Sequence, residues 1–253
     1  MITTCCIDVG LRNLSLCIMN SNYEILLWNI YDVFETCEKT CTAKMKNDKI
    51  CNKKCSYKYN NTDNIESYSC KLHFPKNIKM TNKNKITLKT IDKYLLQEIA
   101  FKFISKIEEI YNTNIDIFKS LNSIYIELQP KCNPKMLFIS HILYGKLIEL
   151  FKQEQDNTII RFIRATQKLK SYDGPPLVCN LKGKYAQRKW YSIQYAKWFL
   201  ENKINSSENE KWYPFFQDCK KKDDISDSLN FAVNILIGVC PSKLKHKNGN
   251  ELK

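Results

Sequence analysis

The amino-acid sequence predicts an α/β fold: a mixed five-stranded sheet flanked by helices and interrupted by one small insertion. Three observations lead to this prediction. Three short apolar, β-branched runs follow one another at the N-terminus, strand and helix patterns alternate after residue 90, and cysteines and lysines are concentrated between these two parts. An alternation of strands with amphipathic helices is typical of α/β domains, in which helices cover the faces of a sheet.

The N-terminal runs predict an antiparallel meander of three strands. Residues 2–9 are apolar or β-branched and end at Gly10, a second run covers residues 14–19, and a third covers residues 23–30. A Ser–Asn pair at residues 21–22 supplies the turn between the second and third runs. Runs joined by such short connections pair as neighbouring antiparallel strands.

The second half of the chain alternates between helix and strand patterns. Apolar residues at three- to four-residue spacing predict amphipathic helices, and continuous apolar runs predict buried strands. Residues 165–184 contain two glycines and two prolines and predict a loop. The other expected elements are a helix over 91–111, a strand over 122–128, a helix over about 135–152, a strand over 158–163, and helices over 185–201 and about 223–240.

The length and charge of the chain constrain its class. With 253 residues, it can form one domain over residues 1–253 that contains an insertion at residues 37–90. A net charge of +14 favours a polyanionic partner such as nucleic acid, because lysines and arginines neutralise phosphates. Only four of the 40 basic residues are arginines, however, and a composition rich in lysine and asparagine also follows from AT-rich coding. The charge by itself therefore leaves both explanations open.

The sequence lacks the signals of a membrane or secreted protein. No apolar run reaches the roughly 18–20 residues that cross a bilayer, and the N-terminus has neither a cationic region nor a cleavage signal. We therefore expect a soluble, intracellular protein without a membrane partner. In a reducing compartment, clustered members of the 12 cysteines would bind metal rather than form disulfides.

Four acidic residues form the candidate catalytic site. Asp8 and Glu127 lie at the ends of predicted strands, and Asp224 and Asp227 are three residues apart on one face of the last predicted helix. Acidic residues near a helix N-terminus can also serve only as caps. Together, however, the four carboxylates would meet at one end of the sheet and repel one another unless cations neutralise them. Such oxygen ligands favour two Mg²⁺ or Mn²⁺ ions, which would support hydrolysis of a phosphodiester backbone.

Four segments of the sequence resemble the motif regions of a known enzyme family. The segments IDVGLRNLSLCIM, IELQPKCNPKM, KYAQRKWYSIQYAKWFL and KKDDISDSLNFA are similar, in this order, to those of poxvirus Holliday junction resolvases, which belong to the RuvC group of the ribonuclease H-like superfamily. The resemblance covers about residues 2–30 and 90–240. It implies a ribonuclease H-like fold and a Mg²⁺-dependent endonuclease that cuts branched DNA as a homodimer during viral recombination or replication.

The resemblance also implies roles for individual residues. The metal-binding acids of the family correspond to Asp8, Glu127, Asp224 and Asp227. Asp223 is an alternative to Asp224. The basic segment before a helix implies a lysine that holds the scissile phosphate, for which we select Lys189. Other lysines compete for this role: Lys168, Lys170, Lys182 and Lys184. A viral source would place the protein where viral DNA replicates, in a cytoplasmic factory or the nucleus, or in the virion.

The insertion contains a candidate zinc site. Its potential ligands are spaced Cys37-x3-Cys41-x9-Cys51-x3-Cys55-x14-Cys70-x2-His73. A structural zinc site needs four ligands, and we predict Cys41, Cys51, Cys70 and His73, with Cys37 and Cys55 as alternatives. The segment has few large aliphatic residues, so zinc would stabilise it by coupling binding to folding. It also has 13 lysines and several tyrosines, among them Tyr57, Tyr59 and Tyr68, and could grip a DNA arm.

Three other classes of protein compete with the resolvase interpretation. Another nuclease of the same fold, such as an RNA–DNA hybrid nuclease or an integrase-like enzyme, would use the same carboxylates. Sugar kinases and actin-like ATPases also begin with an Asp-x-Gly strand, but they duplicate their domain, and a second such strand is not found in the sequence. The third alternative is a non-catalytic zinc module that binds DNA through the basic insertion.

Overall fold

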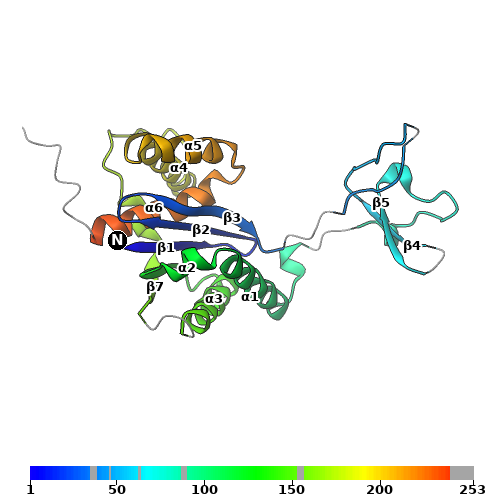
Figure 1. The fold of residues 1–253 in the computed structure, drawn as a ribbon, viewed down its shortest axis with the longest axis horizontal. Helices are drawn as coiled ribbons and strands as arrows, with labels where there is room; N and C mark the ends of the chain where they lie inside the picture. Colours follow the sequence, from blue (N-terminus) through cyan, green and yellow to red (C-terminus); the bar gives the residue numbers. More distant parts are fainter. Residues whose placement is uncertain (35–38, 46, 62–63, 87–89, 153–156, 240–253) are drawn as a thin grey trace, which may run out of the picture. The chain divides into compact units, whose positions relative to one another are not determined.

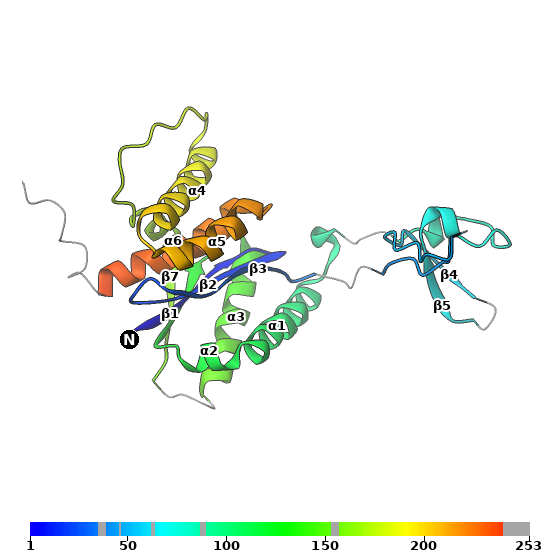
Figure 2. The same cartoon turned by 45° about the horizontal axis from the view of Figure 1, so that its top comes forward.

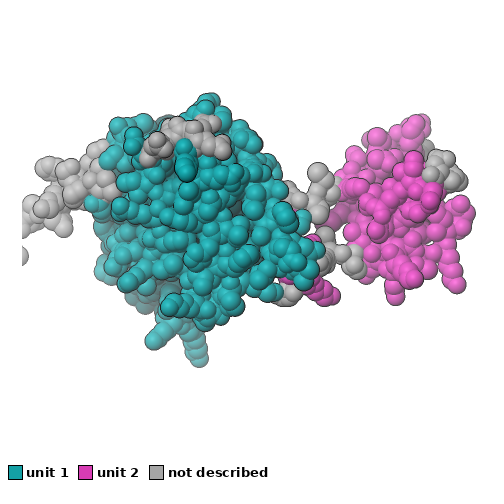
Figure 3. All heavy atoms as spheres, turned by 90° about the horizontal axis from the view of Figure 1, so that it is seen from below, with its two compact units in different colours: residues 1–33, 95–253 teal, residues 34–94 magenta. Residues whose placement is uncertain are grey.

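The structure, a computed structural model, describes residues 1–34, 39–45, 47–61, 64–86, 90–152 and 157–239. The chain divides into two compact units, which are coloured separately in Figure 3. Met1–Val33 and Leu95–Lys253 form the first, here called the sheet unit, and Phe34–Tyr94 form the second, here called the cysteine unit. The second unit contains the predicted insertion. The alternative zinc ligand Cys37 lies outside the described residues.

The predicted mixed five-stranded sheet is confirmed, and its strand order is β3-β2-β1-β6-β7. The first three strands pair antiparallel, and β1 pairs with β6, and β6 with β7, in parallel. The meander therefore lies at one side of the central strand β1 and the later strands at the other. The strands are β1 (Thr3–Val9), β2 (Asn13–Asn20), β3 (Ile25–Asp32), β6 (Ser123–Leu128) and β7 (Ile159–Arg164).

Helices cover both faces of this sheet, as Figures 1 and 2 show. On one face lie α1 (Leu96–Thr113), α2 (Ile115–Lys119) and α3 (Pro134–Lys152), and on the other lie α4 (Lys184–Asn202), α5 (Ser206–Asp218) and α6 (Lys222–Val239). The indole of Trp28 stacks on Phe216 with 5.9 Å between ring centroids and donates a hydrogen bond to the carbonyl oxygen of Ile225, 3.0 Å away. This contact joins β3 to α5 and α6 within the core.

Three elements differ from the sequence prediction. The helix expected over 91–111 begins only at Leu96, because residues 91–93 form a 3₁₀ turn in the cysteine unit and the Glu98 carboxylate accepts a hydrogen bond from the Leu95 N–H at 2.7 Å. A short 3₁₀ helix, η4 (Ala165–Leu169), lies in the predicted loop. Helix α5 was not predicted, because Pro214 lies inside it and interrupts the helical pattern.

The cysteine unit is built on a two-stranded hairpin, β4 (Tyr57–Asn60) and β5 (Glu66–Ser69). It also contains three 3₁₀ turns, η1 (Lys71–His73), η2 (Asn82–Asn84) and η3 (Ile91–Lys93). Its buried cluster consists of Cys41, Cys55 and Cys70, against which Tyr68 and Ile86 pack. Such a small core agrees with the prediction that the insertion lacks large aliphatic residues.

Among the described residues, no helix has both the length and the apolar character needed to cross a membrane.

Candidate active site and candidate metal centre

The pairing of β1 with β6 brings Asp8 and Glu127 to the same end of the sheet. The two strands are parallel, and Ile7 is paired with Ile126, so the next residue on each strand carries the carboxylate. Gly10 then turns the chain toward β2: its N–H donates to the carbonyl oxygen of Asn13 at 2.9 Å. A Cβ atom at Gly10 would lie 2.8 Å from that same oxygen, so the turn that follows Asp8 requires glycine.

Lys168 lies among three of the four predicted carboxylates. Its Nζ is 3.7 Å from Oδ1 of Asp8 and 3.3 Å from Oε1 of Glu127, and it also donates to Oδ2 of Asp227. The side chains of the four residues are between 12% and 19% exposed. Lys168 comes from η4, inside the stretch predicted to be a loop, and its sequence context predicts it only as a competitor of Lys189 for binding the phosphate.

The pKa values of the cluster reflect this crowding. Burial, and then the charge of Glu127, raise the pKa of Asp8 well above its ordinary value. Burial also raises the pKa of Asp227, although Lys168 and Ser192 oppose the shift. For Glu127, burial acts in the same direction, but hydrogen bonding with Asp8 and the Lys168 ammonium bring its pKa below the ordinary value. Burial alone would lower the pKa of Lys168, and the charges of the three carboxylates raise it instead.

The other predicted acidic residues lie at the N-terminal end of α6. Asp224 accepts a hydrogen bond from Nδ2 of Asn13 at 3.1 Å. Asp223 forms an ion pair with Lys189, which lowers the pKa of Asp223 against the opposing effect of burial. Lys189 also lies 4.9 Å from the ring centroid of Tyr185. The structure therefore brings Asp8, Glu127 and Asp227 together around Lys168, and pairs Lys189 with Asp223.

Two polar residues that were not predicted from the sequence donate hydrogen bonds to these carboxylates. Gln129 is 7% exposed, and its Nε2 donates to Oε2 of Glu127 at 3.2 Å. Ser192 of α4 donates to Oδ1 of Asp227. The position of Gln129 two residues after a strand carboxylate was visible in the sequence, but the contact of Ser192 depends on how α4 packs against α6.

The three converging carboxylates fit a divalent cation. Their oxygens are hard ligands of the kind that Mg²⁺ and Mn²⁺ prefer, and they already surround one positive charge, the Lys168 ammonium. Three buried carboxylates in one cluster require neutralisation by cations. Asp8, Glu127 and Asp227 would hold the ion, with Asp224 on the preceding turn of α6 as a further ligand.

The cysteine unit brings together the four residues predicted as zinc ligands. The potential ligand atoms of Cys41, Cys51, Cys70 and His73 all lie within 4.8 Å of one another. The His73 Nδ1 is 3.6 Å from the Cys41 sulfur and 3.4 Å from the Cys70 sulfur, and the Cys51 and Cys70 sulfurs are 3.9 Å apart. Tetrahedral zinc with Zn–S bonds of about 2.3 Å and Zn–N bonds of about 2.0–2.1 Å requires ligand separations of roughly 3.5–3.8 Å. The three shorter separations are close to these values, so the arrangement suits a tetrahedral zinc ion.

Local backbone structure positions these four ligands. The Cys41 N–H donates to the Lys53 carbonyl oxygen at 2.8 Å and the Cys51 N–H to the Ala43 carbonyl oxygen at 2.9 Å, which places the two cysteines on paired segments. Residues 71–73 form η1, which returns His73 toward Cys70. Burial raises the pKa of the Cys70 thiol, but backbone N–H groups of His73 and Leu72 lower it below its ordinary value, which favours the thiolate form that binds metal.

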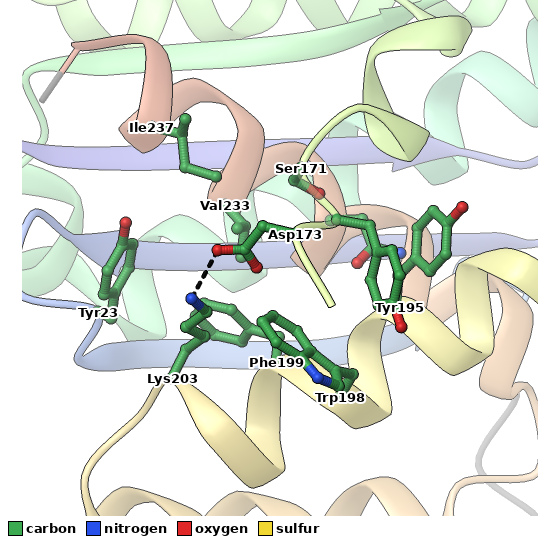
Figure 4. A pocket seen from close by; sticks show the side chains of 11 residues that line it. Tyr23, Ser171, Asp173, Tyr195, Trp198, Phe199, Lys203, Val233 and Ile237 are labelled. Carbon is green, nitrogen blue, oxygen red and sulfur yellow. Dashed lines mark hydrogen bonds and ion pairs between the residues drawn. The ribbon is translucent and has the colours of Figure 1, made fainter. Parts of the chain in front are cut away.

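A depression next to α4 and α6, drawn in Figure 4, is lined by aromatic side chains and by the Asp173–Lys203 ion pair, whose oxygen and nitrogen are 2.6 Å apart. Its free volume of ≈ 10 Å³ admits about one water molecule. One of the residues that line this depression, Asn230, also donates a hydrogen bond to Ser192 next to the carboxylate cluster.

Comparisons with known proteins find a relative among curated proteins and several similar solved structures. The chain matches no protein-family model. It is 28% identical to the uncharacterized protein L451 of Acanthamoeba polyphaga mimivirus over 221 residues, a match that covers 79% of this chain and 51% of that relative. The chain thus spans about half the length of the curated relative it matches.

Two of the similar solved structures are of Holliday junction resolvases. The yeast mitochondrial Holliday junction resolvase Ydc2 is 13% identical with a TM-score of 0.41, over 92% of this chain and 77% of that chain. RuvC of T. thermophilus, in complex with a Holliday junction substrate, is 8% identical with a TM-score of 0.44, over 94% of this chain and 96% of that chain. At such identities residue roles do not transfer, so the roles given to residues of this chain depend on its own geometry.

Proposed function

We propose that the chain is a metal-dependent endonuclease that resolves four-way DNA junctions. The observation that carries this proposal is the convergence of Asp8, Glu127 and Asp227 around the Lys168 ammonium at one end of the sheet. Bound Mg²⁺ or Mn²⁺, two ions in the complete site, would activate a water molecule and stabilise the leaving oxygen of a phosphodiester. The choice of branched DNA follows from the resemblance of four sequence segments to viral resolvases.

We assign the phosphate-binding role to Lys168 in place of Lys189. Lys168 contacts all three carboxylates, so its ammonium is within reach of any phosphate that binds next to them. Charge-assisted hydrogen bonds to a phosphate oxygen would stabilise the negative charge that develops during cleavage. The ammonium of Lys189 is instead paired with Asp223, and the Lys189 side chain is 41% exposed, which suits a contact with DNA farther from the scissile bond.

The partners follow from charge and symmetry. Residues 37–90 contain 13 lysines and four acidic residues, and this excess of positive charge supports the proposal that the cysteine unit binds a DNA arm. Paired cuts across a two-fold junction need two active sites, and we therefore propose a homodimer. Helix α3 exposes Phe138 by 40% and Ile148 by 39%, which makes it a candidate for the dimer contact. Zinc bound by Cys41, Cys51, Cys70 and His73 would hold the cysteine unit together.

The source of the chain belongs to the same proposal. The relative from a mimivirus and the resemblance to poxvirus enzymes support an origin in a large DNA virus. The protein would then act at the site of viral DNA replication or be carried in the virion.

The proposal is tested by cleavage of a labelled four-way junction with Mg²⁺ or Mn²⁺. We expect paired nicks from the wild-type protein and a rate at least about 100-fold lower in Asp8→Asn and Asp227→Asn, because each substitution removes a carboxylate that holds the cation. The exposed Asp218→Asn is the matched control and should cleave as the wild type does.

Linear duplex and RNA–DNA hybrid substrates separate the competing functions. If hybrid or linear DNA is cleaved as fast as the junction, the chain is another nuclease of the same fold and not a resolvase. Binding of the junction without cleavage by any metal would favour the non-catalytic DNA-binding module.

A further inference from the structure

One oxygen of the Asp227 carboxylate is held by a buried pair of polar side chains from two helices. Ser192 of α4 donates a hydrogen bond to Oδ1 of Asp227. Behind it, Nδ2 of Asn230 lies 2.9 Å from the carbonyl oxygen of Ser192 and 3.0 Å from its Oγ. Ser192 and Asn230 are each 1% exposed. This chain of contacts runs from the core of the sheet unit to the carboxylate cluster.

The chemistry of these groups determines the direction of each hydrogen bond. A backbone carbonyl can only accept, so the amide nitrogen of Asn230, and not its oxygen, must face Ser192. The second N–H of the same amide then points to Ser192 Oγ, which accepts it. An ionised carboxylate can only accept, so the Ser192 hydroxyl donates its proton to Asp227 while its oxygen accepts the bond from Asn230. Asn230 thus orients the Ser192 hydroxyl as a donor.

The two oxygens of Asp227 therefore have different tasks. Oδ1 is occupied by Ser192, whereas Oδ2 faces Lys168 at the centre of the carboxylate cluster. A carboxylate on a helix can otherwise rotate about its terminal torsion, which is broad and two-fold. A hydrogen bond to one oxygen from a buried hydroxyl fixes that torsion and lowers the entropic cost of binding a cation through the other.

We infer that Ser192 and Asn230 are positioning residues that present Oδ2 of Asp227 to the catalytic cation. This inference rests on the proposed function, because it needs a cation at the carboxylate cluster. Asn230 also lines the small depression described above, and both side chains are almost fully buried, which leaves the pair little freedom to move. Carboxylates that bind metal are commonly oriented by hydrogen-bonding partners of this kind.

The test measures the Mn²⁺ affinity of the full-length protein by electron paramagnetic resonance of free Mn²⁺. Binding that is lost in Asp8→Asn is attributed to the carboxylate cluster. We expect Ser192→Ala to weaken that binding about 10- to 100-fold, as loss of such an orienting partner does elsewhere. Asn230→Leu should weaken it less, because the hydroxyl remains. Ser192→Thr, which keeps the hydroxyl, should bind Mn²⁺ like the wild type.

Ser228→Ala is the matched control. Ser228 is buried on α6, next to Asp227 in the sequence. It shares a 2.8 Å hydrogen bond with Ser15, and that bond does not involve the Asp227 carboxylate. Its removal should lower thermal stability in EDTA about as much as Ser192→Ala does and leave Mn²⁺ affinity unchanged. Wild-type affinity in Ser192→Ala, or equal weakening in Ser228→Ala, would overturn the inference alone. Wild-type protein that binds no more Mn²⁺ than Asp8→Asn would overturn the proposed metal site and the inference with it.

Discussion

Lys168 and the three carboxylates around it form an ionic cluster whose members depend on one another. The four side chains are less than one fifth exposed, so each charge has lost most of its hydration. Desolvation of this kind is compensated only while the opposite charges remain, and removal of one partner leaves the others buried without compensation. The same residues that suit the site for a divalent cation therefore influence its stability.

Substitution of Lys168 should make folding depend on metal. In Lys168→Met the carboxylates lose their positive partner, and we expect about 3 kcal/mol lower stability in EDTA, at the lower end of what loss of one partner of a buried pair costs. Mn²⁺ should restore most of this loss, because it replaces the missing charge. Urea unfolding with and without Mn²⁺ measures both quantities. The more exposed Lys189→Met is the control, and an equal loss with and without Mn²⁺ would contradict the prediction.

Asp8 leads to a prediction about pH. Its pKa is raised in the folded protein by burial and by Glu127, so the folded state holds the proton more tightly than the unfolded chain does. Asp8 therefore lowers stability progressively as the pH rises above the ordinary pKa of an aspartate toward the raised value. In EDTA, Asp8→Asn should be more stable than the wild type, and the difference should be larger at pH 8 than at pH 5. A stability difference between Asp8→Asn and the wild type that is smaller at pH 8 than at pH 5 would contradict this prediction.

At the scale of secondary-structure elements, α6 and the hairpin of the cysteine unit show two ways of positioning ligands. The α6 helix places Asp224 and Asp227 above a buried face that includes Leu229, Ala232 and Val233, so its carboxylates are positioned by tertiary packing. The cysteine unit has only a small buried cluster, and its ligands are positioned by short backbone turns. A unit with so little core gains much of its stability from metal binding.

Zinc content should depend on the four clustered ligands and not on the neighbouring thiol. We expect about one zinc ion per chain in the wild type, in line with one tetrahedral site, and its loss in Cys41→Ser and Cys70→Ser. Cys55 is also buried in the cluster but is not among the four grouped ligands, so Cys55→Ser should keep the metal. Elemental analysis of the purified proteins decides the matter. Loss of zinc in Cys55→Ser with retention in Cys41→Ser would require a different ligand set.

At the scale of the whole molecule, the chain combines a sheet unit that carries the acidic cluster with a lysine-rich cysteine unit. The insertion leaves the sheet unit after β3 and returns before α1, and near its ends Phe34 and Tyr94 pack with 4.7 Å between ring centroids. The ends of the insertion are therefore close together, which allows it to be replaced by a short linker. Electrostatic attraction to DNA depends on the number of phosphates that lysines neutralise.

Replacement of residues 36–92 by a short Gly–Ser linker should weaken junction binding and reduce its salt dependence. If the unit neutralises several phosphates, the slope of log K against log salt should become less steep by roughly 0.9 for each lost contact. Fluorescence anisotropy over a salt series provides the slope, and Mn²⁺ binding by the shortened protein shows that the sheet unit is intact. An unchanged affinity and slope would exclude DNA binding by the insertion.

The sequence alone determined the features that depend on local pattern. Short apolar, β-branched runs predicted the five strands. The spacing of Cys70 and His73 predicted two ligands close together, because a few residues of chain suffice to bring such groups together. The acidic residues at the strand ends were predicted from the strand pattern, but their meeting depends on the parallel pairing of β1 with β6. Helix α5 was missed because its packing, with Trp212 and Phe216 buried, outweighs the effect of Pro214.

The tertiary structure alone decided which distant side chains meet the carboxylates. Lys168 lies 41 residues from Glu127 and 59 from Asp227 along the chain, and Ser192 lies 35 residues from Asp227, so no local pattern predicts these contacts. In a sequence with 40 basic residues, many lysines are equally plausible partners for an acidic site. Only the packing of η4 and α4 against α6 selects Lys168 for the cluster and leaves Lys189 with Asp223, because side-chain contacts between elements depend on how the elements pack.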